Sequence, residues 1–174
     1  MRWLRLLFAL INSGFKSKLT INDSSSISFR VWITDVDASI MNHAAMMTVF
    51  EAGRIDFIKR VGFFKLIRQK QWYFASGGMS VQFFRPLKVF QKAEVTTAVL
   101  HVSEQWIYTK QIITRKGKDI AICIAKSKAK KGKEDIHTDE IMTYLKEIKK
   151  PVTTNALIES YETSNILFKE NLGN

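Results

Sequence analysis

The sequence predicts a two-layer α+β domain in which one long helix packs against one antiparallel sheet. Apolar residues occupy every second position from Ile27 to Ile33, with Ser28 and Arg30 on the opposite face, which is the period of a half-buried strand. The apolar spacing becomes helical over 43–61. Four strand-like segments follow, and the connections between them are too short for parallel crossovers. We therefore expect a strand, a long helix and then a meander of four strands.

Size and composition fit one main domain with a short extension at each end. The chain has 174 residues, of which 46% are hydrophobic and 25% charged, enough for one sizeable core. Its one cysteine, Cys123, excludes an internal disulfide framework, and no Cys/His cluster indicates zinc. We predict an N-terminal amphipathic segment at 1–22, the main domain at 23–133, and a C-terminal helix and tail at 134–174.

The N-terminal segment combines apolar bulk with basic residues. Its uninterrupted apolar run, 6–11, is far shorter than the roughly 20 residues that span a bilayer. No small-x-small cleavage site follows, which argues against a signal peptide. We expect a short amphipathic helix with Trp3, Leu7 and Leu10 close to one face. It either packs on its own domain or a partner subunit, or residues 1–19 make a peripheral membrane contact.

The long helix has a broad apolar stripe at steps of three, four and seven residues. The stripe consists of Met46, Phe50, Gly53, Phe57 and Val61. Asn42 is a suitable N-cap, and Gly62 a suitable C-terminal stop. Gly53, which has no side chain, would let a neighbouring backbone come close.

The strand segments after this helix are predicted at 73–84, 93–102, 106–115 and 119–128. Residues 120–124 are apolar without alternation, so we expect that strand to be covered on both faces. A final helix is predicted at 135–150, where Pro151 ends it. The tail from Val152 shows only weak periodicity.

The segment that most clearly indicates a functional site is residues 34–44, T-D-V-D-A-S-I-M-N-H-A. It lies between the first strand and the long helix. A helix start presents unpaired N–H groups and partial positive charge, which suit a carbonyl oxygen that gains negative charge. Asp37 lies a few residues upstream, so its carboxylate can face the same point. Such a carboxylate can activate water or attack, while the amides stabilise the anion. From these residues alone, simple capping by Asp and Asn remains the alternative.

Residues 29–57, together with G-G-M-S-V-Q-F-F-R-P-L at 77–87, resemble hotdog-fold acyl-CoA thioesterases of the 4-hydroxybenzoyl-CoA thioesterase-like superfamily. Their signature is roughly D-x-D-x-x-x-H-x-N-N-x-x-Y, followed by a helix with an E-x-x-R-like element. The resemblance covers about residues 27–130. It implies the hotdog fold, a curved antiparallel sheet of about five strands around one long central helix. Short N-terminal and C-terminal helices would be additions to it.

The resemblance also implies roles within 34–44. Asp37 matches the carboxylate that acts as general base or nucleophile, and the amides near His43 and Ala44 would polarise the thioester carbonyl. Asn42 matches the first Asn and would brace the loop. Two departures matter: Ile40 replaces the motif His, and His43 replaces the second Asn. His43 could assist proton transfer or simply bond the loop.

Glu51 is the second candidate for the catalytic carboxylate. It lies eight residues beyond His43, near the same helix face. Some hotdog thioesterases use a helix Glu in this way. The alternative is an ion pair between Glu51 and Arg54 at i, i+3, which we prefer from the sequence.

The charge balance indicates an anionic partner. Lys and Arg number 27 against 16 acidic residues, for a formal net charge of +11. The candidates for binding the phosphates of coenzyme A are Arg115, Lys116, Lys126, Lys128 and Lys130. A solubilising run at a strand end is the alternative. Nucleic acid is not an expected partner, because interleaved exposed aromatics and a groove-reading helix are not apparent.

We therefore predict a cytoplasmic acyl-CoA thioesterase that uses neither a metal nor a cofactor, with membrane-peripheral association left open. A homodimer or homotetramer is implied by the resemblance. The alternative is a non-catalytic hotdog module that binds acyl-CoA, lipid or a membrane surface.

Overall fold

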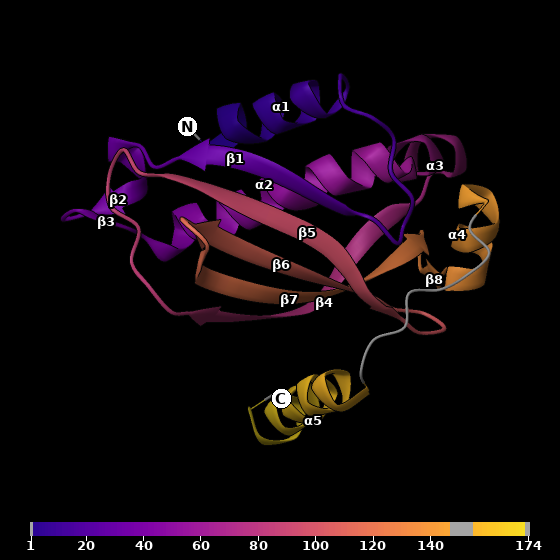
Figure 1. Cartoon of the computed structure of the whole chain (residues 1–174). Helices are drawn as coiled ribbons and strands as arrows, with labels where there is room; N and C mark the ends of the chain where they lie inside the picture. The colour runs from indigo at the N-terminus through magenta and orange to yellow at the C-terminus, as the bar shows by residue number, and fades with distance from the viewer. Residues whose placement is uncertain (1, 147–154, 173–174) are drawn as a thin grey trace.

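The computed structural model describes residues 2–146 and 155–172 (Figure 1). Fourteen elements follow one another along this part of the chain. They are α1 (Arg2–Ser13), β1 (Ser24–Arg30), the 3₁₀ turn η1 (Ile33–Asp35), β2 (Val36–Asp37), β3 (Ile40–Met41), α2 (His43–Val61), α3 (Phe63–Lys70), β4 (Tyr73–Phe83), β5 (Lys92–Val102), β6 (Ile107–Arg115), β7 (Lys118–Lys131), β8 (Glu134–Asp135), α4 (Thr138–Leu145) and α5 (Asn155–Leu172).

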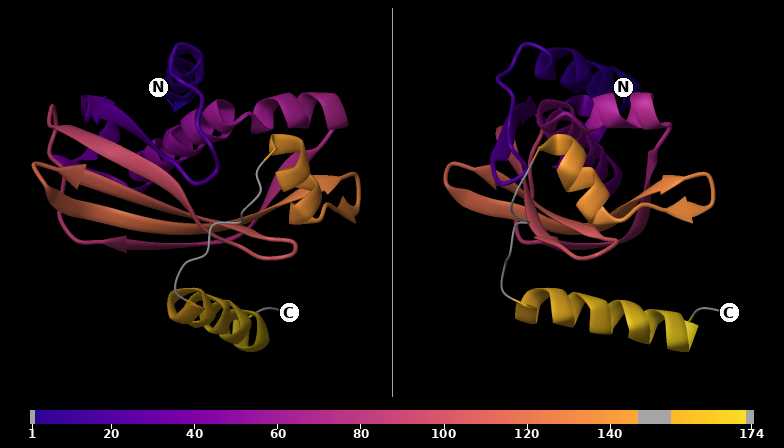
Figure 2. Two further views of the ribbon diagram at one scale, coloured as in Figure 1. Left: turned by 45° about the vertical axis from the view of Figure 1, so that its right-hand side comes forward. Right: turned by 90° about the vertical axis from the view of Figure 1, so that its right-hand side faces the viewer.

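The main sheet has the strand order β1-β5-β6-β7-β4, and every neighbouring pair is antiparallel. The short β8 adds to β7, while β2 and β3 form a separate hairpin. The sheet curves around α2, and α5 lies on the opposite side of the sheet (Figure 2). This is the expected hotdog fold, with α2 as its central helix.

Local signals set both ends of α2. The Asn42 side chain accepts a hydrogen bond from the Ala45 amide at 2.8 Å, which caps the first turn. Gly62 ends the helix in the left-handed region, with φ at 97°. The long helix is therefore confirmed at 43–61. Its Gly53 does admit a close neighbour, but the neighbours are side chains of the sheet, Thr97 and Gln111, rather than a backbone.

The helix predicted in the N-terminal segment is confirmed as α1, and it packs on its own domain. Leu6 and Ala9 are buried against Ala52 of α2, whereas Leu7 is exposed. The small alanines let the two helices lie close together, as both views in Figure 2 show. The side chain of Trp3 lies outside the described residues. Among the described helices, none is long and apolar enough to cross a membrane.

The first strand ends earlier than its alternation predicts. β1 stops at Arg30, and Ile33 belongs to η1. The cause is the carboxylate of Asp35, which accepts a hydrogen bond from the Trp32 amide at 2.9 Å and turns the chain.

The C-terminal prediction is wrong at its beginning. Asp135 belongs to β8, because its carboxylate pairs with Lys128 and Lys130 of β7. The helix begins only at Thr138, and residues 147–150 of the predicted helix lie outside the described residues.

The tail contains a helix, α5, that its weak periodicity did not indicate. Ile158 and Tyr161 of α5 are buried against Tyr108 and Ile124 on the outer face of the sheet. The neighbouring Cys123 faces the inner core beneath α2. Coverage on both faces, predicted from the apolar run of β7, is thereby confirmed.

Candidate active site

The β2–β3 hairpin brings Asp37 back to the start of α2. Asp37 pairs with Ile40 across the hairpin, and Ala38 makes the turn with a positive φ of 58°. The Asp37 side chain is exposed, and its Oδ1 accepts a hydrogen bond from Asn42 Nδ2 at 3.3 Å. The carboxylate therefore lies beside the N-terminus of the central helix.

Asn42 stabilises this arrangement through three hydrogen bonds, one each at its Oδ1, its Nδ2 and its backbone amide. Its Oδ1 caps the Ala45 amide, and its Nδ2 donates to Asp37. Its backbone amide donates to the Asp35 carbonyl at 2.9 Å. One residue thus fixes the helix start, the carboxylate and the 3₁₀ turn η1 that precedes the hairpin.

The first two amides of α2 remain available. The Ala45 amide is capped by Asn42, and the Met46 amide donates to the Asn42 carbonyl. None of the described residues accepts a hydrogen bond from the amides of His43 or Ala44, and both residues are exposed. Two unpaired N–H groups at a helix N-terminus form an anion-stabilising point.

Apolar side chains lie beside this point. The His43 ring stacks on Phe83 at the end of β4, with ring centroids 4.5 Å apart. Phe83, the adjacent Phe84 and Ile40 are all partly exposed. They form an apolar surface next to Asp37.

Glu51 lies elsewhere on α2. Eight residues of helix separate it from His43, which is about 12 Å along the axis. Its carboxylate forms the ion pair with Arg54 that the spacing suggested. The structure therefore does not bring Glu51 to Asp37.

The five basic candidates fall into two groups. Arg115 and Lys116 lie at the β6–β7 turn, and about 40 Å of strand separates them from Lys128. Lys126 pairs with Glu162 of α5 at 2.5 Å, and Lys130 pairs with Asp135 at 2.8 Å.

The second group belongs to a local ion network. Hydrogen bonds from Lys128 and Lys130 hold the pKa of Asp135 below its ordinary value. Lys126 and Lys128 also lie over the Trp106 ring, 4.4 and 4.8 Å from its centroid. These lysines already have partners in the chain.

The sequence interpretation missed basic residues at the Asp37 end. Lys88 forms an isolated β-bridge with Ile40, and Arg85 donates to the Asp119 carbonyl at 2.5 Å. The Arg115 turn lies at this same end of the sheet, because Phe83 pairs with Ala121 close to the start of β7. The only sequence feature that pointed to these basic residues was the R-P-L strand exit, which contains Arg85.

Arg5 was also missed. Its guanidinium pairs with the carboxylate of Asp35 at 2.6 Å, and Asp35 in turn receives the Asn42 amide. The N-terminal helix therefore supports the loop that holds Asp37. The only sequence features that pointed to this ion pair were the first Asp of D-x-D, Asp35, and a basic residue in an amphipathic helix, Arg5.

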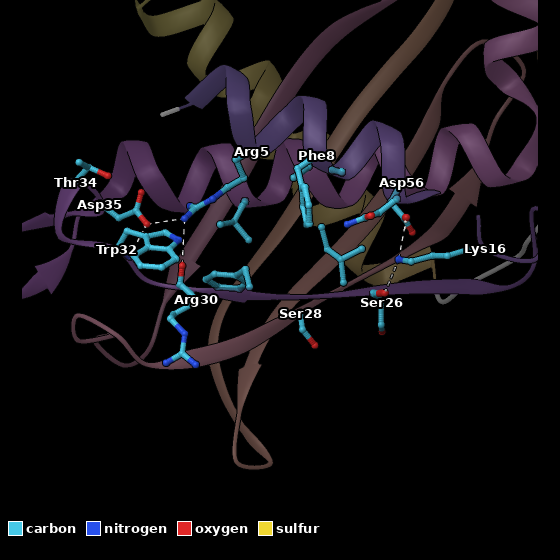
Figure 3. A pocket seen from close by; sticks show the side chains of 16 residues that line it. Arg5, Phe8, Lys16, Ser26, Ser28, Arg30, Trp32, Thr34, Asp35 and Asp56 are labelled. Carbon is cyan, nitrogen blue, oxygen red and sulfur yellow. Dashed lines mark hydrogen bonds and ion pairs between the residues drawn. The ribbon is translucent and has the colours of Figure 1, made fainter. Parts of the chain in front are cut away.

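A cavity of about 930 Å³ lies between α1, α2 and β1 (Figure 3). The Arg5–Asp35 pair closes one end, and the Lys16–Asp56 pair closes the other. Thr34 lines the cavity, but Asp37 does not.

Two further features concern reactivity. Cys123 is buried, and burial raises the pKa of its thiol to about 11. Within the described residues, no group of three or more His, Cys, Asp or Glu side chains could hold a metal ion.

A comparison with models of protein families shows which family the chain belongs to. The model of the thioesterase-like superfamily matches residues 31–129, more than half of the chain and all of the candidate site. The chain belongs to this superfamily. The match confirms the resemblance noted in residues 29–57 and 77–87.

Solved structures with the same fold as this thioesterase-like chain include several thioesterases. The probable thioesterase YbaW from Escherichia coli is 14% identical, with a TM-score of 0.65 over 70% of this chain and 96% of that one. The DHNA-CoA thioesterase from Staphylococcus aureus is 18% identical, with a TM-score of 0.61 over 84% and 94%. A thioesterase from Thermus thermophilus, in complex with coenzyme A and Zn, is 16% identical, with a TM-score of 0.59 over 71% and 96%. A search of curated proteins found no significant match.

Proposed function

We propose that this protein hydrolyses acyl-CoA thioesters with Asp37 as its catalytic carboxylate. One observation carries the proposal: the exposed Asp37 carboxylate lies beside a helix N-terminus whose first two amides are unpaired among the described residues. Membership in the thioesterase-like superfamily supports the thioester class. The coenzyme A thioesterases among the solved structures of this fold support coenzyme A as the thiol.

The reaction follows from these groups. Asp37 takes a proton from a water molecule that attacks the thioester carbonyl carbon, or attacks that carbon itself. Negative charge forms on the carbonyl oxygen, where the His43 and Ala44 amides donate to it. With water as the nucleophile, the carbon–sulfur bond then breaks and the thiolate receives the proton that Asp37 took. With Asp37 as the nucleophile, breaking that bond leaves an acyl–Asp37 anhydride; water then hydrolyses it, which restores the carboxylate and supplies the proton to the thiolate. The products are a free acid and coenzyme A.

The surroundings of Asp37 suit both halves of the substrate. Ile40, Phe83 and Phe84 offer apolar contact to the acyl group. Lys88 and Arg115 are the basic residues that we assign to the phosphates of coenzyme A, since they lie at the same end of the sheet. The lysines 126, 128 and 130 are less suited, because acidic residues of the chain already neutralise them.

A second copy of the chain would complete the assembly. β4 and β1 end the sheet in the described part of the chain. Arg5 and Lys16 donate to carbonyls along β1, whereas β4 offers an edge of 11 residues. We propose a homodimer through β4, which places its Phe83 end next to the interface.

The test is release of free thiol from a panel of acyl-CoAs of increasing chain length, with aromatic acyl groups included. Turnover by the wild type that disappears in Asp37→Asn but persists in Glu51→Gln would support the proposal. The reverse pattern would transfer the role to Glu51. Saturable acyl-CoA binding without any turnover would instead identify a non-catalytic binding module.

A further inference from the structure

The N-terminal helix has a second apolar face that its own domain leaves uncovered. Leu7, Phe8 and Ile11 are 52%, 67% and 51% exposed, and Phe15, just after α1, is 86% exposed. At 100° per residue the three helical side chains, Leu7, Phe8 and Ile11, fall within about 100° of arc. The inner face, with Leu6 and Ala9, already packs on α2. The outer stripe is therefore not needed to hold α1 in place.

The apolar surface continues beyond the helix. Phe8 projects toward the cavity between α1 and β1, and Trp32 lies at the other side of the same cavity (Figure 3). Trp32 is more than half exposed. Exposed Phe and Trp side chains on an amphipathic helix and its rim are typical of proteins that bind at a membrane interface.

Basic residues surround the C-terminal end of this stripe. Residues 1–22 contain four basic and no acidic residues. Lys59 donates to the Leu10 carbonyl and Arg60 to the Ser17 carbonyl, so both lie at the end of α1. Lys18 is exposed and makes no ion pair with another described residue. Asp56 opposes this group through Lys16 and Arg60, and Asp23 also interacts electrostatically with Arg60.

The C-terminal helix provides an internal comparison. α5 also exposes large apolar side chains, among them Ile166, Leu167 and Phe168. Its residues 155–172 contain three Glu and one Lys, so its charge is negative. The two helices thus present similar apolar surface with opposite charge, and only α1 complements an anionic surface.

We propose that the outer face of α1 binds the surface of an anionic lipid bilayer. Leu7, Phe8, Ile11 and Phe15 enter the interface, and Lys18 and Lys59 meet the headgroups. A lipid surface fits better than a second copy of this chain, because a second copy on this face would bring its own Lys18 and Lys59 against the same basic residues. The bound helix lies flat on the bilayer and does not cross it.

Vesicle flotation tests the proposal without any need for turnover, so it is independent of the proposed reaction. The probes are vesicles of phosphatidylcholine with phosphatidylglycerol, and of phosphatidylcholine alone. The wild type should float with the anionic vesicles, and high salt should reduce the bound fraction. A triple variant, Leu7→Gln, Phe8→Gln and Ile11→Gln, should bind at least about tenfold more weakly. The matched triple variant on α5, Ile166→Gln, Leu167→Gln and Phe168→Gln, should bind like the wild type.

Several results would overturn the proposal. The wild type could fail to float, or the α1 and α5 variants could float equally well. A wild-type mass that rises with concentration and drops only in the α1 variant, without vesicle binding, would make this face an interface between copies. Circular dichroism melting checks that the variants are folded. Should the triple variant not fold, Lys18→Glu gives the same test through charge, and unchanged flotation would then contradict the proposal.

Discussion

Asn42 is the residue on which the candidate site depends most, and its two roles can be separated. Asn42→Ala removes the N-cap and the donor to Asp37, so we expect a loss of about 1 kcal/mol in stability together with a loss of turnover. Asn42→Asp keeps a cap and should unfold at nearly the wild-type denaturant concentration. Because Asn42→Asp keeps the cap but loses the amide that donates to Asp37, its turnover should fall while its stability does not. Full turnover in Asn42→Asp would show that this hydrogen bond is not needed for activity.

Cys123 gives a pH dependence of stability whose sign can be worked out. The folded thiol keeps its proton until its pKa of about 11, whereas the ordinary value is 9.0. Between these values the unfolded chain binds fewer protons, so the free energy of unfolding should fall by about 2–3 kcal/mol as the pH rises. Urea unfolding at several pH values checks this. Cys123→Ala should have a shallower slope than the wild type, and equal slopes would contradict the assignment.

At the residue scale, the part of the site that can be predicted is the part that is local in sequence. Asp37 and Asn42 are five residues apart, and the helix start that joins them is visible in the capping pattern. Arg5 and Lys88 reach the same loop from 30 and 48 residues away, through a helix contact and a β-bridge. Pattern and spacing carry no information about such contacts until the fold is known.

At the element scale, the packing of α2 on the sheet depends on Gly53. A Cβ there would lie 2.8 Å from Thr97 Oγ1 and 3.1 Å from Gln111 Nε2, both buried. Gly53→Ala should gain about 1 kcal/mol of helix propensity but lose about 1–3 kcal/mol through overpacking. We expect a net loss of stability in denaturant unfolding.

Two controls sharpen this prediction. Ser160→Ala on the exposed face of α5 reports propensity without overpacking and should be neutral or slightly stabilising. Thr97→Ala removes the closest atom, so the double variant with Gly53→Ala should lose less stability than the two single losses added together. Simple additivity would mean that the Thr97 contact is not the cause.

Whether the ends of an element can be predicted depends on whether the residues that set them are close in sequence. The ends of α2 are set by Asn42 and Gly62, which are local signals. By contrast, Asp135 is drawn into β8 by lysines of β7, and β1 is ended by a side chain that lies beyond it. Among the α5 residues whose burial the structure describes, only Ile158 and Tyr161 are buried, too few to produce a clear helical stripe in the sequence.

At the scale of the whole molecule, the open edge of β4 predicts an assembly of two copies. Light scattering should give a mass of twice the 20.1 kDa chain, and dilution should lower it if the interface is of ordinary size. A stable monomer with full thioesterase activity would contradict the role of a second copy. The apolar face of α1 should not contribute, so its triple Gln variant should keep the dimer mass.

The two terminal helices carry opposite charge and lie on opposite sides of the sheet. α1 carries positive charge and lies over α2, while α5 carries negative charge on the other side of the sheet. The Arg5–Asp35 pair joins α1 to the loop that holds Asp37. The helix that we propose binds the membrane is therefore joined by this ion pair to the loop of the candidate active site.

The central claim is that the Asp37 carboxylate performs chemistry rather than only shaping the loop. The most direct measurement compares the wild type with Asp37→Asn in two assays: kcat for the best acyl-CoA, and affinity for a thioether analogue that cannot be hydrolysed. Our account predicts that kcat falls by about 10²–10⁴-fold while the affinity for the analogue changes by less than about threefold. Equal kcat in the two proteins, or a loss of affinity as large as the loss of rate, would contradict it.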